Sequence, residues 1–131
     1  MFIENQLKSY FLDKSYIIAV MLYGSYAFGN EKTESDVDIA VLKNNESLTP
    51  EEKTKMMIDL MKLLDKNIDL VSFGDAPCVL QMQILKNGKL IICRDEKAYF
   101  QFQVRVIQEY LDLKKIRKPI EEELKNVSIY G

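Results

Sequence analysis

Positions 23–42 of the chain read YGSYAFGNEKTESDVDIAVL. The preceding residues, 16–22, form a short apolar run with β-branched side chains, which predicts a buried strand. Gly24 and Ser25 interrupt that run, and a loop of small and polar residues follows. Residues 37–42 then predict a second strand. The pattern is therefore a strand, a Gly-Ser turn, a polar loop and another strand.

Two carboxylates, Asp36 and Asp38, stand at the start of the second predicted strand. Because side chains alternate along a strand, both are expected on the same face, with Cα atoms roughly 6.5 Å apart. Carboxylates at this spacing can hold one divalent cation or bridge a pair, and paired cations catalyse in-line displacement at phosphorus. Oxygen ligands, in a sequence that contains no histidine, favour Mg²⁺ or Mn²⁺ over zinc.

Gly24 and Ser25 fit the same chemistry. A glycine lets the backbone approach a phosphate closely, and a helix that starts after Ser25 would attract anions through its free N–H groups. The serine hydroxyl would then face the terminal phosphates. Taken alone, a Gly-Ser pair is more simply a turn, and Asp-Val-Asp is more simply a solvated strand end. Their combination at this spacing favours a phosphate and metal site.

A third carboxylate is expected from Asp69, which lies between Ile68 and Leu70 in a predicted strand over residues 67–73. A charge among buried neighbours is costly unless it is paired or bound to a metal. Asp69 is therefore either a site residue, which we favour, or a strand-end residue with its own salt bridge. Asp65 and Asp75 stand in turn contexts and are weaker candidates.

Gly24-Ser25, a gap of ten residues, Asp36-Val37-Asp38 and the later Asp69 together resemble the signature of the nucleotidyltransferase superfamily that includes DNA polymerase beta. For so short a chain, the resemblance is greatest to the minimal nucleotidyltransferases, the MntA-like antitoxins that pair with HEPN-domain toxins. This resemblance covers residues 16–73 well.

The resemblance implies a nucleotidyltransferase fold and transfer of AMP from ATP to a hydroxyl, expected to be a tyrosine hydroxyl, of a partner HEPN ribonuclease toxin. It implies ATP bound at Gly24 and Ser25, and two Mg²⁺ ions, or Mn²⁺, held by Asp36, Asp38 and Asp69. Asp69 would serve as a metal ligand or as the general base.

Two other functions stay open at this point. The chain could neutralise its partner by binding alone, with a vestigial nucleotide site. It could also be a small-molecule, antibiotic-type nucleotidyltransferase that works as an oligomer. We rank both behind modification of a protein, because a chain of this length has little room for a substrate-binding domain and a protein acceptor brings its own geometry.

Length and composition limit the possibilities. The 131 residues indicate one domain, and 47% hydrophobic residues are enough for a core. A net charge of −2 argues against sequence-independent binding to long nucleic acid, which requires a basic surface. Cys78 and Cys93 lack metal-ligand spacing and are read as reduced thiols of a cytoplasmic protein. No signal peptide or membrane-length apolar run is expected.

The remaining pattern predicts a small mixed β-sheet flanked by helices, an α/β (α+β) fold with a long C-terminal helix. Helices are expected over residues 2–13, 79–85 and 96–118, with another from a Thr49–Glu52 capping box to Leu64. A strand over 89–94 is expected at a sheet edge. Asp75 is expected to cap the helix over 79–85. Lys89 and Arg94 could meet phosphate, although solvated edge charges are the simpler interpretation.

The helix over 96–118 carries two apolar stripes. One consists of Tyr99, Phe102, Val106, Tyr110 and Leu113, and the other of Phe100, Val104, Ile107 and Leu111. Two stripes exceed what a surface helix normally buries, so the second is either a partner surface in a hetero-oligomer or part of a deeply sunk helix. Pro119 is expected to stop the helix and to leave residues 118–131 as a loose tail.

Overall fold

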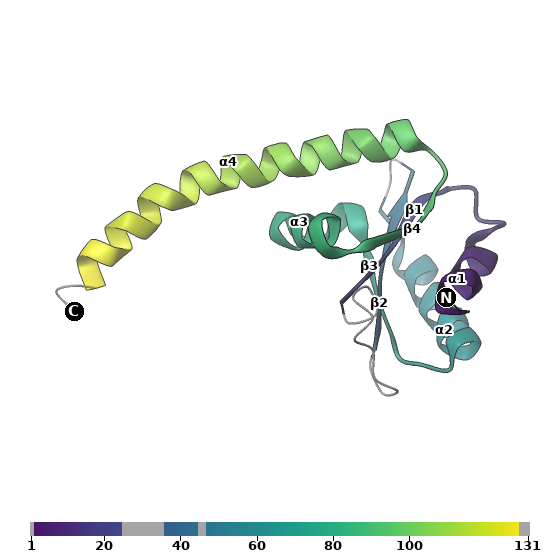
Figure 1. Cartoon of the computed structure of the whole chain (residues 1–131). Coiled ribbons are helices and arrows are strands. Elements are labelled where there is room, and N and C mark those ends of the chain that lie inside the picture. Colours follow the sequence, from purple (N-terminus) through teal and green to yellow (C-terminus); the bar gives the residue numbers. More distant parts are fainter. Residues whose placement is uncertain (1, 25–35, 45–46, 129–131) are drawn as a thin grey trace.

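In the computed structural model, which describes residues 2–24, 36–44 and 47–128, helices and strands follow the predicted order (Figure 1). The elements are α1 (Phe2–Phe11), β1 (Ile17–Tyr23), β2 (Val37–Lys43), α2 (Pro50–Leu64), β3 (Ile68–Ser72), the 3₁₀ turn η2 (Phe73–Asp75), α3 (Cys78–Asn87), β4 (Lys89–Cys93) and α4 (Glu96–Ser128). None of the helices in the described residues combines the length and apolar character that a membrane crossing needs.

The four strands form one mixed sheet in the order β3-β2-β1-β4. β1 pairs antiparallel with both β2 and β4, whereas β2 and β3 are parallel. Parallel neighbours need a crossover connection, and α2 supplies it. The prediction that β4 lies at an edge is confirmed.

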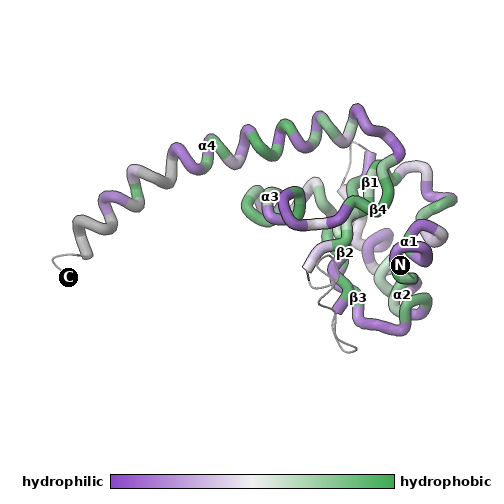
Figure 2. The backbone as a smooth tube through the Cα atoms, viewed as in Figure 1, coloured by the Kyte–Doolittle hydropathy of each residue, from purple (hydrophilic) through white to green (hydrophobic). Residues whose placement is uncertain are grey.

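Helices cover both faces of the sheet (Figure 1). Alternation along β2 sends Val37, Ile39 and Val41 into one core with α1 and α2, while Ala40 and Leu42 join a second core with α3 and α4. Figure 2 shows hydrophobic residues concentrated in the strands and alternating with hydrophilic ones along α4. The predicted fold class, a mixed sheet flanked by helices with a long C-terminal helix, is confirmed.

The capping box at the start of α2 forms as predicted. The Thr49 hydroxyl accepts a hydrogen bond from the Glu52 backbone N–H at 3.1 Å, and the Glu52 carboxylate accepts one from the Thr49 N–H at 2.9 Å. The same carboxylate pairs with Lys43 at 2.8 Å. Because Lys43 ends β2, this ion pair ties the strand to the start of the crossover helix.

The predicted cap of α3 is wrong. Asp75 ends the 3₁₀ turn η2, and α3 begins only at Cys78, with Pro77 at the N-cap and no side-chain capping bond. The extra turn moves Asp75 away from the free N–H groups of α3. Its carboxylate instead accepts a hydrogen bond from the Ser47 hydroxyl.

Pro119 does not stop α4, because the helix continues through it to Ser128. A proline inside a helix removes one hydrogen bond and bends the axis, but it does not force an end where strong helix formers follow. The residues after Pro119 read IEEELK, which favour helix. The part of the chain from residue 118 to 128, predicted as a tail, is therefore helical.

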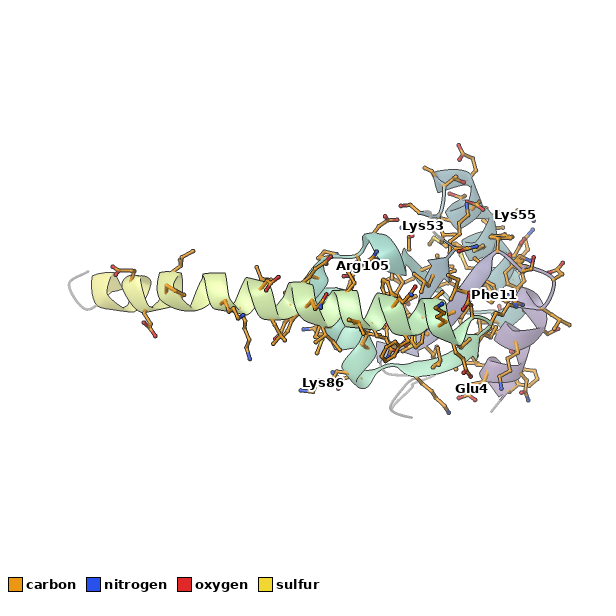
Figure 3. The ribbon with its side chains drawn as sticks, turned by 90° about the horizontal axis from the view of Figure 1, so that it is seen from above. Glu4, Phe11, Lys53, Lys55, Lys86 and Arg105 are labelled. Carbon is orange, nitrogen blue, oxygen red and sulfur yellow. The ribbon has the colours of Figure 1, made fainter. Side chains whose placement is uncertain are left out.

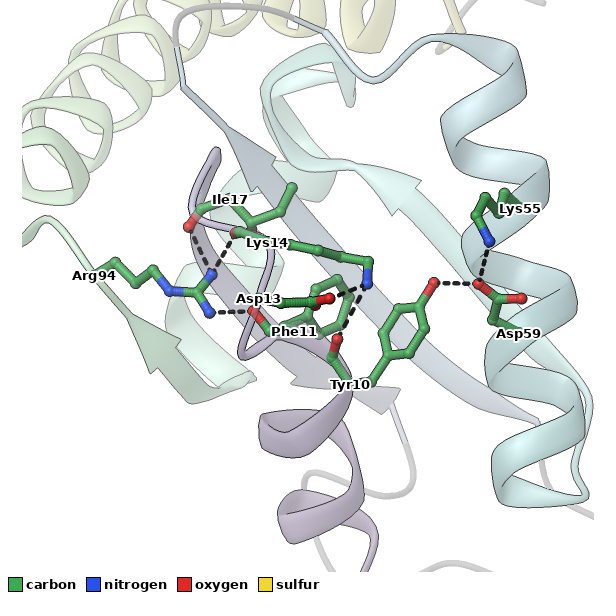
Figure 4. Close-up of polar contacts among 8 residues, drawn as sticks. All are labelled: Tyr10, Phe11, Asp13, Lys14, Ile17, Lys55, Asp59 and Arg94. Atoms are coloured by element: carbon green, nitrogen blue, oxygen red, sulfur yellow. Dashed lines mark hydrogen bonds and ion pairs between the residues drawn. The ribbon is translucent and has the colours of Figure 1, made fainter.

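Arg94, predicted as an edge charge, ties the N-terminal segment to the sheet (Figure 4). Its guanidinium donates to the carbonyl oxygens of Lys14 at 2.6 Å and Ile17 at 3.3 Å, and also to that of Phe11. Lys89, the other candidate for phosphate contact, forms an ion pair with Glu4 of α1. Both cations therefore hold α1 and its following turn against β4.

We expect Arg94→Lys to destabilise the fold by about 1–2 kcal/mol, because a single ammonium cannot reach three carbonyls that a planar guanidinium spans. The measurement is urea unfolding followed by circular dichroism. Lys86→Arg, an exposed change near the end of α3, is the control and should leave the midpoint unchanged. Equal midpoints for Arg94→Lys and wild type would contradict this role.

Candidate functional site

Three polar side chains stand in a row across β1, β2 and β3. The strand register places Tyr23 opposite Asp38 and Asp38 beside Asp69. The next residues on this face, such as Ala40, belong to the core under α3 and α4. The face is thus apolar toward one end and acidic at the other, as alternation from Asp38 to Leu42 predicts. We call Tyr23, Asp38 and Asp69 the acidic row.

Asp36 lies one residue before β2 and is exposed, as is Asp69, whereas Asp38 is half-buried. Asp36 still acts on the row, because its negative charge helps to raise the pKa of Asp38. The sequence therefore located all three carboxylates at one end of the sheet. Ser25, predicted to bind the terminal phosphates, lies outside the described residues.

The electrostatics of the row are those of crowded like charges. Burial raises the pKa of Asp38, and the charges of Asp69 and Asp36 and a hydrogen bond with Asp69 raise it further. Burial, followed by the charges of Asp69 and Asp38, raises the pKa of Tyr23 to about 12. The Tyr23 hydroxyl therefore keeps its proton at neutral pH, while ionised Asp38 is held at an energetic cost that a cation would relieve.

Gly24 makes the closest approach to the row. Its φ of +70° lies in the left-handed region, and a Cβ built there would stand 2.2 Å from an Asp38 carboxylate oxygen. Glycine suits this position, because a side chain would strain the backbone at this φ and would force the Asp38 carboxylate to move. Gly24 was predicted to let the backbone approach a phosphate. In the structure, its lack of a side chain leaves room for the Asp38 carboxylate.

The donor set suits a hard divalent cation, since positive charge would relieve the repulsion that helps to raise the pKa of Asp38. Within the described part of the chain, no three acidic, cysteine or histidine side chains are gathered closely enough to form a complete metal cluster. Asp38 and Asp69, which are neighbours across β2 and β3, and the nearby Asp36 are the carboxylates that could contribute to such a site.

Tyr23 was not among the site residues predicted from the sequence. The available signal was its position as the last residue before Gly24, where an antiparallel partner strand must bring it opposite the Asp-Val-Asp segment. That inference needed the pairing register, which the sequence pattern alone did not supply.

A cavity of about 470 Å³ opens at the other end of this sheet face, lined in part by Leu42, Phe102 and Arg105. The length of β2 separates it from Asp38, about 13 Å for the four steps from Asp38 to Leu42. Asp75, the carboxylate that lines this cavity, accepts a hydrogen bond from the Ser47 hydroxyl. This cavity is therefore distinct from the acidic row.

Comparison with known proteins connects this geometry to one family. The family model for Polymerase beta, Nucleotidyltransferase matches residues 5–97. That range contains Gly24, Asp36, Asp38 and Asp69 together with all four strands.

Curated relatives point the same way. The chain is 32% identical over 101 residues to the protein adenylyltransferase MntA of Shewanella oneidensis, a match that covers 77% of this chain and 71% of that protein. It is 25% identical over 120 residues to the protein adenylyltransferase MntA of Aphanizomenon flos-aquae, covering 85% of this chain and 80% of that one.

Solved structures share the fold. A toxin-antitoxin structure with AMP-PNP has a TM-score of 0.80 and 28% identity, and the match covers 93% of this chain and 98% of that chain. A complex of the tri-AMPylated Shewanella oneidensis HEPN toxin with its MNT antitoxin has a TM-score of 0.74 and 26% identity, covering 95% and 97%.

Gly24→Ala should destabilise the fold by about 1–2 kcal/mol, because the new methyl group meets Asp38 and the backbone conformation disfavours it. Thermal unfolding tests this expectation. Gly74→Ala is the matched control, since a Cβ there meets Leu42 at an ordinary 3.8 Å. A melting temperature lowered equally by both changes would show that the Gly24 contact carries no special cost.

Asp38→Asn should stabilise the fold at pH 7, by up to about 1 kcal/mol, because it removes like-charge repulsion in the row. The folded protein holds the Asp38 proton more tightly than the unfolded chain does, since the folded pKa is raised. The stability gained from that proton is lost as the pH rises through the folded pKa. At about pH 3 the advantage of the variant should vanish.

The control is Asp59→Asn. Hydrogen bonds from Tyr10 at 2.7 Å and Lys55 at 3.1 Å lower the pKa of Asp59 (Figure 4). Its contribution is present above the unfolded pKa and is lost as the pH falls through the folded pKa, so this variant should be less stable at pH 7. Urea unfolding at both pH values measures the two signs. Destabilisation by Asp38→Asn at pH 7 would contradict the like-charge account.

Proposed function

We propose that this chain, which belongs to the Polymerase beta nucleotidyltransferase family, transfers AMP from ATP to a hydroxyl of a HEPN ribonuclease toxin and thereby acts as its antitoxin. The observation that carries the proposal is the pair Asp38 and Asp69, set side by side next to Gly24. The relatives named protein adenylyltransferase and the complex with a tri-AMPylated HEPN toxin support the choice of acceptor.

ATP would bind with its triphosphate at Gly24 and Ser25. Asp36, Asp38 and Asp69 would hold Mg²⁺, with two ions expected and Mn²⁺ as an acceptable substitute. When bound, the metal supplies positive charge to the phosphates and lowers the pKa of an attacking hydroxyl. The raised pKa of Asp38 supports this assignment, because a site that crowds carboxylates favours a cation.

We assign the acceptor side of the site to Asp69, an exposed residue of β3 beside the half-buried Asp38. The acceptor oxygen, expected to belong to a tyrosine, forms a bond to the α-phosphorus of ATP. The bond from that phosphorus to the bridging oxygen breaks, and pyrophosphate leaves with the electron pair. Asp69 takes the hydroxyl proton or orients the group that does.

Tyr23 would act by position and not as a base. Its pKa of about 12 keeps the hydroxyl protonated at neutral pH. It stands opposite Asp38 in the strand register, so its side chain would flank one side of the row. This arrangement would limit the directions from which water reaches the Asp38 carboxylate.

We assign this activity to the cytoplasm. Cys78 and Cys93 are free thiols, which suits a reducing compartment. The substrates, ATP and an intracellular ribonuclease, are cytoplasmic as well.

The double variant Asp36→Asn, Asp38→Asn should lose AMP transfer by at least about 100-fold while it still folds and binds the toxin. The test is intact mass spectrometry of the product of the neighbouring gene, co-expressed with either protein. Wild type should add whole AMP units, and the double variant should add none. Asp59→Asn, which leaves the acidic row intact, is the control and should transfer AMP.

Three results would overturn the proposal. Undiminished transfer by the double variant would remove the carboxylates from the chemistry. Neutralisation of the toxin with no gain in mass would establish an antitoxin that works by binding alone. Consumption of ATP with an antibiotic or metabolite, and no protein acceptor, would establish a small-molecule enzyme.

A further inference from the structure

α4 has two apolar faces, and the domain uses one of them. Tyr99, Phe102 and Val106 are buried under the sheet at 8%, 5% and 0% exposure. The other face consists of Phe100, Val104, Ile107 and Leu111, which are 63%, 37%, 41% and 50% exposed. We call these four residues the outer stripe. The structure thus decides between the two alternatives for this stripe: it is not sunk into the fold.

The outer stripe has the spacing of a helix–helix seam. Its residues follow one another at intervals of four, three and four, which is the 3.5-residue repeat of a coiled coil. The stripe runs about 17 Å along the helix, or three turns. Four large apolar side chains in such a row fit the apolar edge of a single partner helix.

The residues beside the stripe are mainly basic. At 100° per residue, Lys97 and Lys115 fall on one side of it, and Lys114 falls on the other side with Glu96. Lys97, Lys114 and Lys115 are exposed. A partner helix that carries carboxylates beside its own apolar seam would satisfy all three lysines.

A second copy of this chain fits less well. Antiparallel packing along the stripe would set Lys97 against Lys115 of the other copy and Glu96 against Lys114, whereas parallel packing would set Lys114 against Lys115 and Glu96 against Lys97. Each attraction is thus matched by a repulsion between lysines, so self-association gains no net benefit from these charges. Each arrangement repeats its lysine pair twice by symmetry, because the two copies are identical. The charges therefore favour a different, acidic partner over self-association.

The position of α4 also suits a partner that is held and modified. Figure 1 shows α4 crossing over the domain and extending well beyond it, and Figure 3 shows the same arrangement from above. α4 covers the apolar end of the sheet face through residues such as Phe102, whereas the acidic row lies toward the other end. A protein docked on the outer stripe would leave the carboxylates accessible.

We propose that the outer stripe is the docking surface for the toxin, which binds it through one amphipathic helix flanked by carboxylates. This inference rests on the proposed function for the identity of the partner. It separates two tasks in one chain: α4 holds the toxin, and the acidic row modifies it. Changes in the stripe alter affinity, and changes in the row alter chemistry.

The test compares Ile107→Glu with Ile58→Glu. Both residues are exposed to a similar degree, at 41% and 47%, but Ile58 lies on α2, on the other face of the sheet. Glutamate retains helix propensity, so both variants should fold. Isothermal titration with the purified product of the neighbouring gene, the proposed toxin, should show binding at least tenfold weaker for Ile107→Glu and within twofold of wild type for Ile58→Glu.

The lysines give a second, independent variant. Lys97→Glu with Lys115→Glu should weaken binding at least tenfold, and added salt should no longer weaken it further, because two attractive charge pairs become repulsive. Lys62→Glu, an exposed change on α2, is the matched control and should bind as wild type does.

Kinetics distinguish this inference from the proposed function. AMP transfer by Ile107→Glu should show a KM for the toxin raised at least tenfold with kcat unchanged, whereas the Asp36/Asp38 double variant loses kcat. Toxin binding that depends on the stripe, without any AMP transfer by wild type, would refute the proposed function and leave this inference standing.

Two results would overturn the inference. The first is toxin affinity and KM for Ile107→Glu equal to those of wild type. The second is sedimentation of the wild-type chain alone as a dimer that Ile107→Glu converts to a monomer, which would assign the outer stripe to a second copy.

Discussion

The register between β2 and β3 sets two carboxylates side by side, and much of the structure can be understood as supporting that contact. Asp38 and Asp69 are neighbours on one face, and Asp36 adds a third negative charge nearby. Like charges at this spacing oppose folding, and the raised pKa of Asp38 records that opposition. Gly24 takes a left-handed conformation to leave room for the Asp38 carboxylate. Positive charge relieves repulsion of this kind, and the proposed divalent cation would supply it.

The rest of the domain keeps this register from slipping. A shift of one residue would exchange the two faces of β2 and bury Asp38 in the core under α1 and α2. Val37, Ile39 and Val41 are fully buried there, so such a slip would expose three large apolar side chains. The ion pair between Lys43 and Glu52 secures the end of β2 to α2. Arg94 secures the turn before β1 through three backbone carbonyls. The acidic row is therefore held by contacts that lie well away from it.

α4 gives the domain a second functional face. Its inner face completes the core beneath the sheet through Tyr99, Phe102 and Val106. The outer stripe repeats the same apolar chemistry at a helical offset and is exposed. A helix that only covered a sheet would carry polar residues there. An enzyme that modifies a protein benefits from separate binding and reacting surfaces. Non-covalent contacts made far from the reacting atoms supply affinity for the acceptor without occupying the catalytic site.

Local patterns determined much of this protein, and residues distant in sequence decided the rest. Short apolar runs located β1, β2 and β3, with Asp38 and Asp69 among them, and the Thr49–Glu52 capping box located the start of α2, because each of these signals lies within a few residues. The role of Asp75 could not be read in this way, since its partner Ser47 is 28 positions away in the chain. The same holds for Arg94, which reaches carbonyls 77 to 83 positions away, and for Tyr23, whose place in the row depends on strand pairing. Pro119 was misread for the opposite reason, because the preference of one residue was outweighed by the helix formers around it.

The sequence by itself determined which side chains could do the chemistry. The tertiary structure decided which of them meet, and that the second stripe of α4 remains exposed, because pairing register and burial depend on contacts between segments that no local pattern encodes.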